Sequence, residues 1–426
     1  MEFSKILENL VSPKFDENIL IGIIKDIFKL KEVFIQHIEF KPEQKKGDSY
    51  LSTVSAFTVQ ARGKDVREDN IKEIVFPLIS KVLPKNIGWR NTFRLLDFFQ
   101  NEVIFYNVVW KAMNKFQLSK HCEPVFDQIP LCISAFSDGS NDYVLLEDMT
   151  YKGYIRLTRS DGLDFEHSRI ILRSFAKVHA LGLAFKDQKP EEFETIANSL
   201  QASDVWWLRD WYCNFQNNNL LPVAYDAVAK QLPDIYLERL KNCTCNDFYG
   251  KLVDYTAVKG RLAVVTHGDA WAPNFLFKYD ENDILQDAVM IDFQMSRYAS
   301  LALDLTFFLY SCTEESLRIK FWDTLIEDYH KTFISTLEKL GSSPELLTLD
   351  DLRSEIKTCA LFGVGMSLEA VPMAMLEDGE VANLNDISDT EHVSLEKVLI
   401  VRPFKSEKKR QRIADIIKHA VDNDFI

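Results

Sequence analysis

Residues 264–294 read VVTHGDAWAPNFLFKYDENDILQDAVMIDFQ, and this stretch decides how the whole chain is interpreted. An apolar strand at 264–265 runs directly into His267-Gly268-Asp269. The alternating residues from Asn274 onward and the apolar run that ends at Asp292 predict two strands joined by a turn at 280–283. A hairpin centred on residue 283 places Asn274 nearly opposite Asp292, roughly 4.5–5.5 Å apart at Cβ. Asp269 is expected in the loop beside them.

The residue types in this hairpin point to a particular chemistry. Oxygen ligands at a hairpin mouth, with a further carboxylate beside them, suit a hard divalent cation such as Mg²⁺. Each residue taken alone is more often an ordinary polar residue at a strand end. Together, a loop Asp, an Asn five residues later and an Asp ending a later strand match the arrangement of phosphoryl transfer. In that scheme Asp269 accepts a hydroxyl proton, and Asn274 and Asp292 hold the metal.

The same scheme requires a lysine on a strand and a glutamate on the following helix. Lys81 interrupts the apolar run IVFPLISKVLP, and Glu102, 21 residues later, interrupts LLDFFQNEVIFY. A snorkelling lysine and a solvated glutamate are the ordinary alternatives for each residue alone. Because both occur in the expected order, we predict that they belong to one nucleotide-binding site.

Length and composition set the frame around these motifs. The chain has 426 residues, which is more than one compact core usually holds. Its hydrophobic fraction of 46% excludes a disordered chain. The formal charge is 50 − 64 = −14, so neither nucleic-acid nor membrane binding is expected. The sequence implies no obligate protein partner. Only 15 residues are glycine, which argues against nucleotide folds that depend on glycine fingerprints.

Cysteine usage and the N-terminal segment favour a reducing, cytoplasmic setting. The seven cysteines are scattered and include no C-x-x-C pair, so neither a disulfide framework nor a zinc site is expected. The start, MEFSKILENL, lacks the basic flank and long apolar run of a secretory signal. No stretch approaches the ~18–20 apolar residues that span a bilayer.

The pattern along the chain predicts a strand-rich first third and a helix-rich remainder. Strands are expected at 50–61, 74–83, 143–146 and within 262–292, and helices at 16–28, 93–113, 169–185 and from 301 onward. We therefore predict a two-lobed α+β fold with a cleft between the lobes. Its parts are a small β-rich N-lobe at 1–145 with an N-terminal helix and a nucleotide-binding sheet, a hinge at 146–150, and a large helical C-lobe at 151–426 that carries the catalytic hairpin 262–292 and the acceptor site.

Five segments carry a resemblance to a known family. LISKVLP, DFFQNEVIFY, YVLLEDM, HGDAWAPN and MIDFQMSRYASLALDL resemble the ecdysteroid kinase-like family of insects, within the wider choline-kinase and aminoglycoside-phosphotransferase group. The resemblance runs from about residue 45 to about residue 340, and HGD-x-W-x-x-N followed by DFQ is its most specific part. It implies a protein-kinase-like fold that uses ATP and Mg²⁺ to phosphorylate a hydroxyl of a lipophilic small molecule, such as an ecdysteroid. The alternative is a catalytically silent protein that keeps the fold and binds lipophilic ligands.

Roles follow from the resemblance position by position. It implies that Asp269 is the catalytic base, that Asn274 and Asp292 are the metal ligands, and that Glu102 holds Lys81 against the nucleotide phosphates.

The resemblance also assigns supporting and hinge residues. The segment 145–149, with Glu147 and Met149, is expected to contact adenine through backbone groups. His267 is expected to brace the catalytic loop, and Asp304 in ALDL is expected to tie that loop from a helix below it.

The phosphate-covering loop is expected at 47–52, with Gly47 and Ser52 as its contacts. No glycine-rich fingerprint occurs in the chain, so the candidate has one glycine between two strands. Backbone N–H groups and a serine hydroxyl are able to cradle phosphate oxygens. A plain polar turn is the alternative.

Three further patterns have ordinary structural explanations. An aromatic cluster at helical spacing and three methionines favour core packing, with the wall of an acceptor pocket as the alternative. His179, on an apolar helix, is expected to be a satisfied core histidine, and Gly363-Val364-Gly365 favours helix packing over a dinucleotide fingerprint. The aromatic cluster and the methionines are Trp206, Trp207, Trp211, Tyr212 and Phe215, and Met366, Met373 and Met375.

Overall fold

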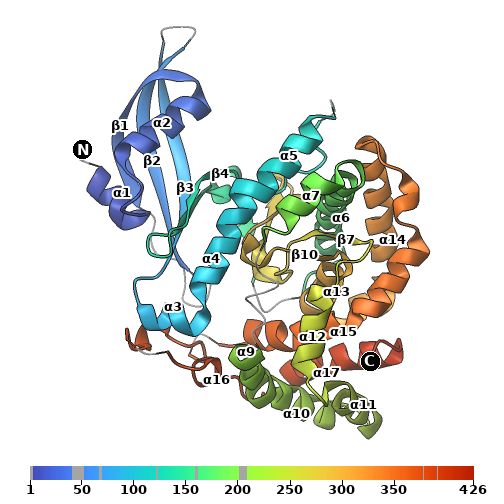
Figure 1. The fold of residues 1–426 in the computed structure, drawn as a ribbon. Helices are drawn as coiled ribbons and strands as arrows, with labels where there is room; N and C mark the ends of the chain where they lie inside the picture. The colour runs from blue at the N-terminus through green and yellow to red at the C-terminus, as the bar shows by residue number, and fades with distance from the viewer. Residues whose placement is uncertain are drawn as a thin grey trace.

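The computed structural model describes residues 3–40, 52–66, 70–120, 123–158, 162–200, 209–377, 379–390 and 392–426. The fold is mixed α+β, with a β-rich N-terminal sheet and a large helical C-terminal part, as predicted (Figure 1). In Figure 1 the sheet lies at the upper left, and the helices fill the right-hand and lower parts of the molecule.

Two helices and a five-stranded antiparallel sheet form the N-terminal part. They are α1 (Ser4–Leu10), α2 (Glu17–Phe28), β1 (Leu30–Phe40), β2 (Thr53–Asp65), β3 (Ile71–Val82), β4 (Cys132–Phe136) and β5 (Tyr143–Glu147), with the strand order β1-β2-β3-β5-β4. Alternate side chains of the strands are buried on one face, where α1 and α2 join them in a separate hydrophobic core. Asp16 caps α2 as predicted, because its carboxylate accepts the backbone N–H of Ile19.

The segment after β3 corrects the prediction of one continuous helix at 93–113. It consists of α3 (Ile87–Phe93), α4 (Leu95–Ile104), a π-helical turn (Phe105–Trp110) and α5 (Lys111–Leu118). Arg94 separates α3 from α4 in the left-handed conformation, with φ of 53°. Its guanidinium is 2.8 Å from the Asp97 carboxylate, which stabilises the break locally. The break gives α4 its own direction, and α4 carries Glu102.

Helices make up most of the chain after residue 164. They are α6 (Phe165–Gln188), α7 (Pro190–Ala197), α9 (Arg209–Phe215), α10 (Leu221–Gln231), α11 (Asp234–Thr244), α12 (Phe248–Ala257), α13 (Ala302–Cys312), α14 (Glu315–Lys339), α15 (Leu349–Ala374), α16 (Leu395–Val398) and α17 (Glu407–Asp422). Their apolar faces share one large core with the C-terminal hairpin. Gly363 lies where α15 crosses α13, and a Cβ there would lie 2.4 Å from the Thr306 carbonyl carbon, so helix packing explains this glycine as predicted.

Two small sheets carry the segment quoted at the outset. One has the order β6-β8-β9, with β6 (Tyr154–Arg156), β8 (Phe275–Tyr279) and β9 (Leu285–Met290), and the other pairs β7 (Ala263–Thr266) with β10 (Arg297–Ser300). The predicted hairpin is present, but its register differs by one residue, because Phe275 pairs with Met290. The backbone partner of Asn274 is therefore Ile291, whose N–H donates to the Asn274 carbonyl at 3.0 Å, and Asp292 is the next residue.

One helical stretch corrects the expectation that no segment is apolar enough to span a bilayer. Residues 344–374 reach a mean hydropathy of 1.2 over an 18-residue window and are long enough to cross a membrane. That window is 78% buried inside the protein, as expected for the core helix of a globular fold. The high hydropathy of this stretch therefore reflects the packing of α15 in the protein core.

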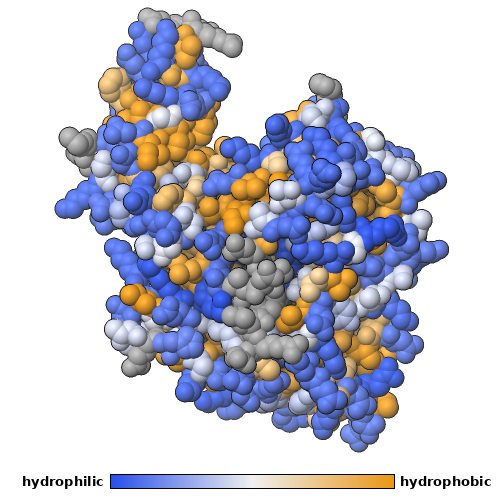
Figure 2. Space-filling model, viewed as in Figure 1, coloured by the Kyte–Doolittle hydropathy of each residue, from blue (hydrophilic) through white to orange (hydrophobic). Residues whose placement is uncertain are grey.

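The surface and the lobe boundary complete the description. Figure 2 shows hydrophobic residues gathered over the N-terminal sheet and mainly hydrophilic residues over the rest of the visible face. Residues 146–150 cover the end of β5 and the beginning of a 3₁₀ turn (Met149–Lys152). A division into lobes at this hinge remains a prediction.

Candidate active site

Lys81, Glu102 and Asp292 form a buried ionic cluster between the N-terminal sheet and the C-terminal hairpin. Lys81 Nζ lies 2.5 Å from Glu102 Oε2 and 2.7 Å from Asp292 Oδ1. The Lys81 and Glu102 side chains are only 9% and 2% exposed. Burial would lower the pKa of Lys81, but Asp292 and Glu102 outweigh it and raise that pKa above its usual value. Burial raises the pKa of Glu102 despite the opposing effect of Lys81. The two residues predicted to cooperate therefore do meet.

Helix α4 is fixed to the segment after Asp292 by further contacts. The Asn101 side-chain amide donates to the carbonyls of Gln294 at 2.9 Å and Ser296 at 2.8 Å. The ring of Phe105 stacks on that of Phe293, with centroids 4.1 Å apart. These contacts hold Glu102 and Asp292 in one rigid arrangement around Lys81, because buried hydrogen bonds and ring stacking resist displacement.

Asp292 ends the hairpin in an unusual backbone conformation. Its φ is 70° and its ψ is 67°, in the left-handed region that non-glycine residues seldom adopt. Its side chain remains 27% exposed and reaches Lys81. The left-handed turn explains how Asp292 lies near Asn274 and Lys81 although the hairpin register does not place it directly opposite Asn274. A strained residue of this kind is frequently associated with a functional site.

Asp269 and Asn274 lie side by side in the loop between β7 and β8. The Asn274 amide donates to Asp269 Oδ2 at 2.9 Å and to the Asp269 carbonyl at 3.0 Å, which orients the carboxylate. Burial, followed by the nearby Asp292 carboxylate, raises the pKa of Asp269 to about 7. A carboxylate with a raised pKa that is fixed by an amide is suited to accept a proton.

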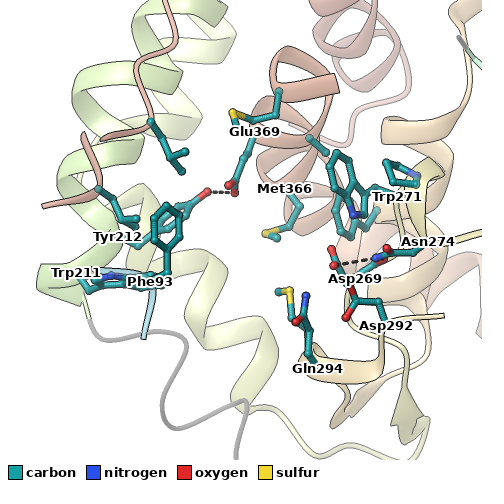
Figure 3. A pocket seen from close by; sticks show the side chains of 17 residues that line it. Phe93, Trp211, Tyr212, Asp269, Trp271, Asn274, Asp292, Gln294, Met366 and Glu369 are labelled. Carbon is teal, nitrogen blue, oxygen red and sulfur yellow. Dashed lines mark hydrogen bonds between the residues drawn. The ribbon is translucent and has the colours of Figure 1, made fainter. Parts of the chain in front are cut away.

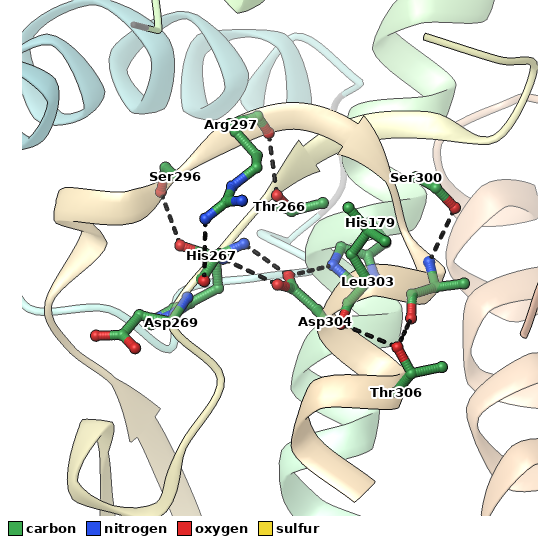
Figure 4. A network of polar contacts seen from close by, with 12 residues as sticks. His179, Thr266, His267, Asp269, Ser296, Arg297, Ser300, Leu303, Asp304 and Thr306 are labelled. Atoms are coloured by element: carbon green, nitrogen blue, oxygen red, sulfur yellow. Dashed lines mark hydrogen bonds and ion pairs between the residues drawn. The ribbon is translucent and has the colours of Figure 1, made fainter. Parts of the chain in front are cut away.

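Asp304 at the start of α13 holds the candidate catalytic loop, which carries His267, Gly268 and Asp269 (Figure 4). Its carboxylate accepts the backbone N–H of His267 at 2.6 Å and of Gly268 at 2.9 Å, and lies 3.1 Å from His179 Nε2. Burial would raise the pKa of Asp304, but the hydrogen bonds and the His179 ring lower it below its usual value. His179 also contacts the Tyr329 hydroxyl at 2.9 Å, so it is a satisfied core histidine as predicted.

His267 and Gly268 shape the same loop from within. His267 Nε2 lies 2.9 Å from the Ile291 carbonyl, and the Asp269 backbone N–H donates to His267 Nδ1 at 3.2 Å. These two contacts fit a neutral ring with its proton on Nε2, and burial lowers the pKa of His267. Gly268 has a φ of 83°, and a Cβ there would lie 1.9 Å from the Met295 carbonyl oxygen. The HGD sequence thus combines a bracing ring, an obligatory glycine and the candidate base.

A cavity of about 270 Å³ lies between the sheet and the hairpin. Lys81, Ser52 and the hinge residues Glu147 and Met149 line it from the N-terminal side, and Asp292 lines it from the hairpin. Its apolar walls come from Val54, Ile79, Leu146, Leu276 and Ile291, and Pro130, Asp148, Thr150 and Arg156 complete the lining. Four of the predicted nucleotide-site residues, Lys81, Ser52, Glu147 and Met149, therefore line one cavity, whereas Glu102 does not line it and contacts Lys81 from behind.

The predicted hinge at 146–150 offers fewer backbone donors than expected. The N–H groups of Glu147 and Asp148 already donate to Leu131 at 3.0 Å and Pro77 at 3.1 Å. The Glu147 carboxylate accepts the Leu131 N–H and lies 2.5 Å from Lys152 Nζ. Neither N–H is therefore available to a purine, and the side chain of Glu147 has structural partners. Gly47 and most of the loop 47–52 lie outside the described residues, and the role of that loop stays a prediction.

A second cavity, of about 130 Å³, opens on the other side of Asp292 and also includes Asp269 and Asn274 (Figure 3). Two residues of the aromatic cluster, Trp211 and Tyr212, line this cavity, whereas its role as an acceptor pocket stays a prediction. Phe215 is fully buried in the core, and Trp206 and Trp207 lie outside the described residues. Met366 and Met373 line the cavity and Met375 does not. The remaining lining residues are Phe93, Trp271, Pro273, Gln294, Met295, Phe307, Glu369, Ala370, Leu395 and Leu399.

The donor set at the junction of the two cavities suits Mg²⁺. Within the described part of the chain, no three His, Cys, Asp or Glu side chains converge to form a complete metal site. Mg²⁺ commonly takes only one or two protein oxygens, with phosphate oxygens and water as its other ligands. Asn274 and Asp292 would supply that small set of oxygens; Asp292 lines both cavities, and Asn274 lines the second.

The sequence patterns did not indicate several residues that shape the site. Asn101 ties α4 to the loop after Asp292, and Glu369 of α15 brings a third carboxylate into the second cavity. Arg297 is buried beneath the catalytic loop, where its guanidinium donates to the Gly268 carbonyl at 3.4 Å. Only Glu369 carried a usable signal, since it is the one charged residue between Met366 and Met373.

Comparison with known proteins agrees with this geometry at the level of the family. An ethanolamine kinase from Plasmodium vivax is 12% identical, with a TM-score of 0.39 and coverage of 100% of this chain and 96% of that one. A GDP complex of aminoglycoside 2′-phosphotransferase-IIIa is 12% identical, with a TM-score of 0.37 and coverage of 95% and 97%. These values are too low to carry activities over to this chain, and no individual curated protein matches it. The Ecdysteroid kinase-like family matches residues 46–342, more than two thirds of the chain, and the chain therefore belongs to that family.

Proposed function

We propose that this protein is an ATP-dependent kinase that phosphorylates a hydroxyl group of an apolar small molecule, such as an ecdysteroid. The observation that carries the proposal is the position of Asp292 at the junction of two cavities. One cavity contains the ionic lysine and the hinge, and the other contains the candidate base and aromatic walls. Phosphoryl transfer requires two substrates to approach each other in line at such a junction.

The first cavity has the features expected of a nucleotide site. Apolar side chains such as Ile79 and Leu276 would contact the flat faces of a purine, and Lys81 would pair with phosphate oxygens. Glu102 holds Lys81 at 2.5 Å, so the ammonium group is already oriented. Mg²⁺ held by Asn274 and Asp292 would neutralise charge on the phosphate oxygens.

The second cavity has the features expected of an apolar acceptor site. Its walls consist largely of aromatic and aliphatic side chains, including Trp211, Trp271 and Phe307. Aromatic rings bury large areas of a flat apolar ligand at a small entropic cost. Asp269 would accept the proton of the reacting hydroxyl as the oxygen attacks, and the hydrogen bond from Asn274 would keep the carboxylate in position.

Two measurements on the purified protein test the proposal. Titration calorimetry should detect ATP binding that strengthens when Mg²⁺ is present, and mass spectrometry should detect phosphorylated products from a panel of sterols and phenols. Replacing Asp292→Asn should weaken the Mg²⁺-dependent part of the binding and abolish product.

Asp287→Asn is the matched control for this experiment. Asp287 lies on β9 of the same hairpin, where its carboxylate accepts the Tyr154 hydroxyl at 2.5 Å, and it lines neither cavity. Its replacement should leave ATP binding and product formation unchanged. Binding of lipophilic compounds without ATP binding or product would refute the kinase and support the silent binder.

A further inference from the structure

Glu369 is the charged residue that faces the second cavity from the C-terminal helices. It lies on α15 three residues after Met366 and four residues before Met373, and the stripe formed by these side chains and Ala370 lines the cavity. Figure 3 shows Glu369 and Tyr212 on one side of the pocket, with Asp269, Asn274 and Asp292 on the other. The cavity therefore has a carboxylate at each end and apolar walls between them.

The surroundings of Glu369 do not neutralise its charge. The Tyr212 hydroxyl donates to the Glu369 carboxylate, and this is the contact that orients it. Burial raises the pKa of Glu369 to about 7, and no lysine, arginine or histidine of the described chain contributes a compensating interaction. Glu369 is partly buried, and a carboxylate withdrawn from water without a cationic partner is costly, since part of its hydration is lost. A ligand that donates a hydrogen bond would recover part of that cost.

The other residues that line the cavity also favour a ligand that donates hydrogen bonds. Among the residues that line the cavity, three are carboxylates and none is a lysine, arginine or histidine. An anionic group on the acceptor would therefore meet repulsion, whereas a neutral or cationic donor would not. The rings of Trp211 and Tyr212 are also compatible with either an apolar scaffold or a cation.

We propose that Glu369, oriented by Tyr212, is a specificity-determining residue that accepts a hydrogen bond from a second donor group on the acceptor, remote from the hydroxyl that is phosphorylated. The donor is a hydroxyl or an ammonium group, which share this chemistry. The acceptor is thus an apolar molecule with a polar donor at each end. This inference rests on the proposed kinase function and narrows its substrate class.

The test uses four candidate acceptors that share one scaffold and differ in a single substituent. Phenylalkanols that carry a methyl, hydroxymethyl, aminomethyl (an ammonium group at neutral pH) or carboxylate group at the para position are offered with Mg²⁺ and ATP, and kcat and KM are measured for each. The wild-type protein should favour the hydroxyl or ammonium compound over the methyl compound by about 10- to 100-fold in kcat/KM, and should reject the carboxylate compound. Glu369→Leu should abolish that preference while the methyl compound is still phosphorylated.

Two further variants show whether the preference depends on the charge of Glu369 and on its position in the cavity. Glu369→Gln should retain much of a preference for the hydroxyl compound but lose a preference for the ammonium compound, which distinguishes the two donors. Glu355→Gln is the control, because Glu355 lies on the same helix, accepts the Ser300 hydroxyl at 2.5 Å and does not line the cavity. It should behave as the wild type does.

The outcomes distinguish this inference from the kinase proposal. If the wild type phosphorylates the methyl compound as well as the others, or if Glu369→Leu keeps the wild-type preference, the role of Glu369 is refuted and the kinase function stands. If no alcohol of any kind is phosphorylated although the protein is folded, both proposals fall.

Discussion

The Asp304 carboxylate should control catalysis without touching either substrate, and Asp304→Asn tests this. Asp304 accepts two backbone N–H groups of the catalytic loop and lies within hydrogen-bond distance of the His179 ring. Asparagine has one side-chain acceptor oxygen, so one of the two buried N–H groups loses its partner. The remaining hydrogen bonds then go to a neutral amide instead of a charged carboxylate. One unsatisfied buried donor costs about 1–3 kcal/mol, and weakening two charged hydrogen bonds adds about 1–2 kcal/mol. The free energy of unfolding should therefore fall by about 2–5 kcal/mol.

The effect on turnover follows from the position of Asp269, two residues beyond His267. When the loop is no longer held, the Asp269 carboxylate shifts relative to the acceptor hydroxyl, and a misplacement of about 1 Å costs on the order of 10²-fold in rate. ATP affinity should change little, because Lys81 and Glu102 are held by other elements. Steady-state kinetics, titration calorimetry with ATP and urea denaturation together measure the three quantities.

Asp142→Asn supplies the matched control for Asp304→Asn. Asp142 is also buried and accepts three hydrogen bonds, from the Ser137 hydroxyl at 2.6 Å and from the N–H groups of Asp138 at 2.9 Å and Gly139 at 2.7 Å. It lies in the turn before β5, away from the catalytic loop. Its replacement should reduce stability by a similar amount and leave kcat unchanged. An equal loss of kcat in both variants, or none in Asp304→Asn, would refute the positioning role.

Three other predictions concern charge and packing. Lys81→Met leaves the buried Glu102 without its cation, so the free energy of unfolding should fall by about 3–5 kcal/mol. ATP binding measured by calorimetry should be lost. ATP affinity at the wild-type level would contradict the assignment of Lys81 to the nucleotide phosphates. Burial, followed by Arg318, lowers the pKa of His419 from 6.5 to about 3, so the unfolded chain binds a proton in that range that the folded protein does not. Stability in urea should fall as the pH decreases from 6.5 toward 3, and the fall should be smaller in His419→Gln. Gly363→Ala should lower the free energy of unfolding by about 1–3 kcal/mol, because the added carbon meets the backbone of α13. Gly22→Ala, with nothing within 4 Å of the added carbon, should stabilise the protein slightly. Equal melting temperatures of the two variants would argue against the α13–α15 contact.

The hairpin and the ionic cluster were predictable because local pattern and residue chemistry point the same way. Alternation from Asn274 onward predicts strands, and a lysine and a glutamate that interrupt apolar runs seldom do so without a partner. Both Lys81 and Glu102 are buried and paired as predicted. Asp304 and His267 are likewise found in contact with the loop.

Other features depend on backbone geometry that residue types do not reveal. The left-handed conformations of Arg94 and Asp292 break a helix and redirect the Asp292 side chain, and neither residue is a glycine or an asparagine that would signal such a turn. Strand β1 has no counterpart among the predicted elements, because two register shifts against β2 disrupt its alternation. Glu369 joins the site only through the tertiary packing of α15, about a hundred residues after Asp269.

The most direct test of the account is the transfer of radiolabelled phosphate from ATP to an alcohol by the wild type and by Asp269→Asn. The wild type should yield a labelled acceptor, and the variant should bind ATP with the same affinity but form product on the order of 10²–10⁴ times more slowly, because the general base is gone. Product formation by Asp269→Asn at the wild-type rate would contradict the assignment of the site. Failure of the folded wild type to label any alcohol would contradict the proposed function itself.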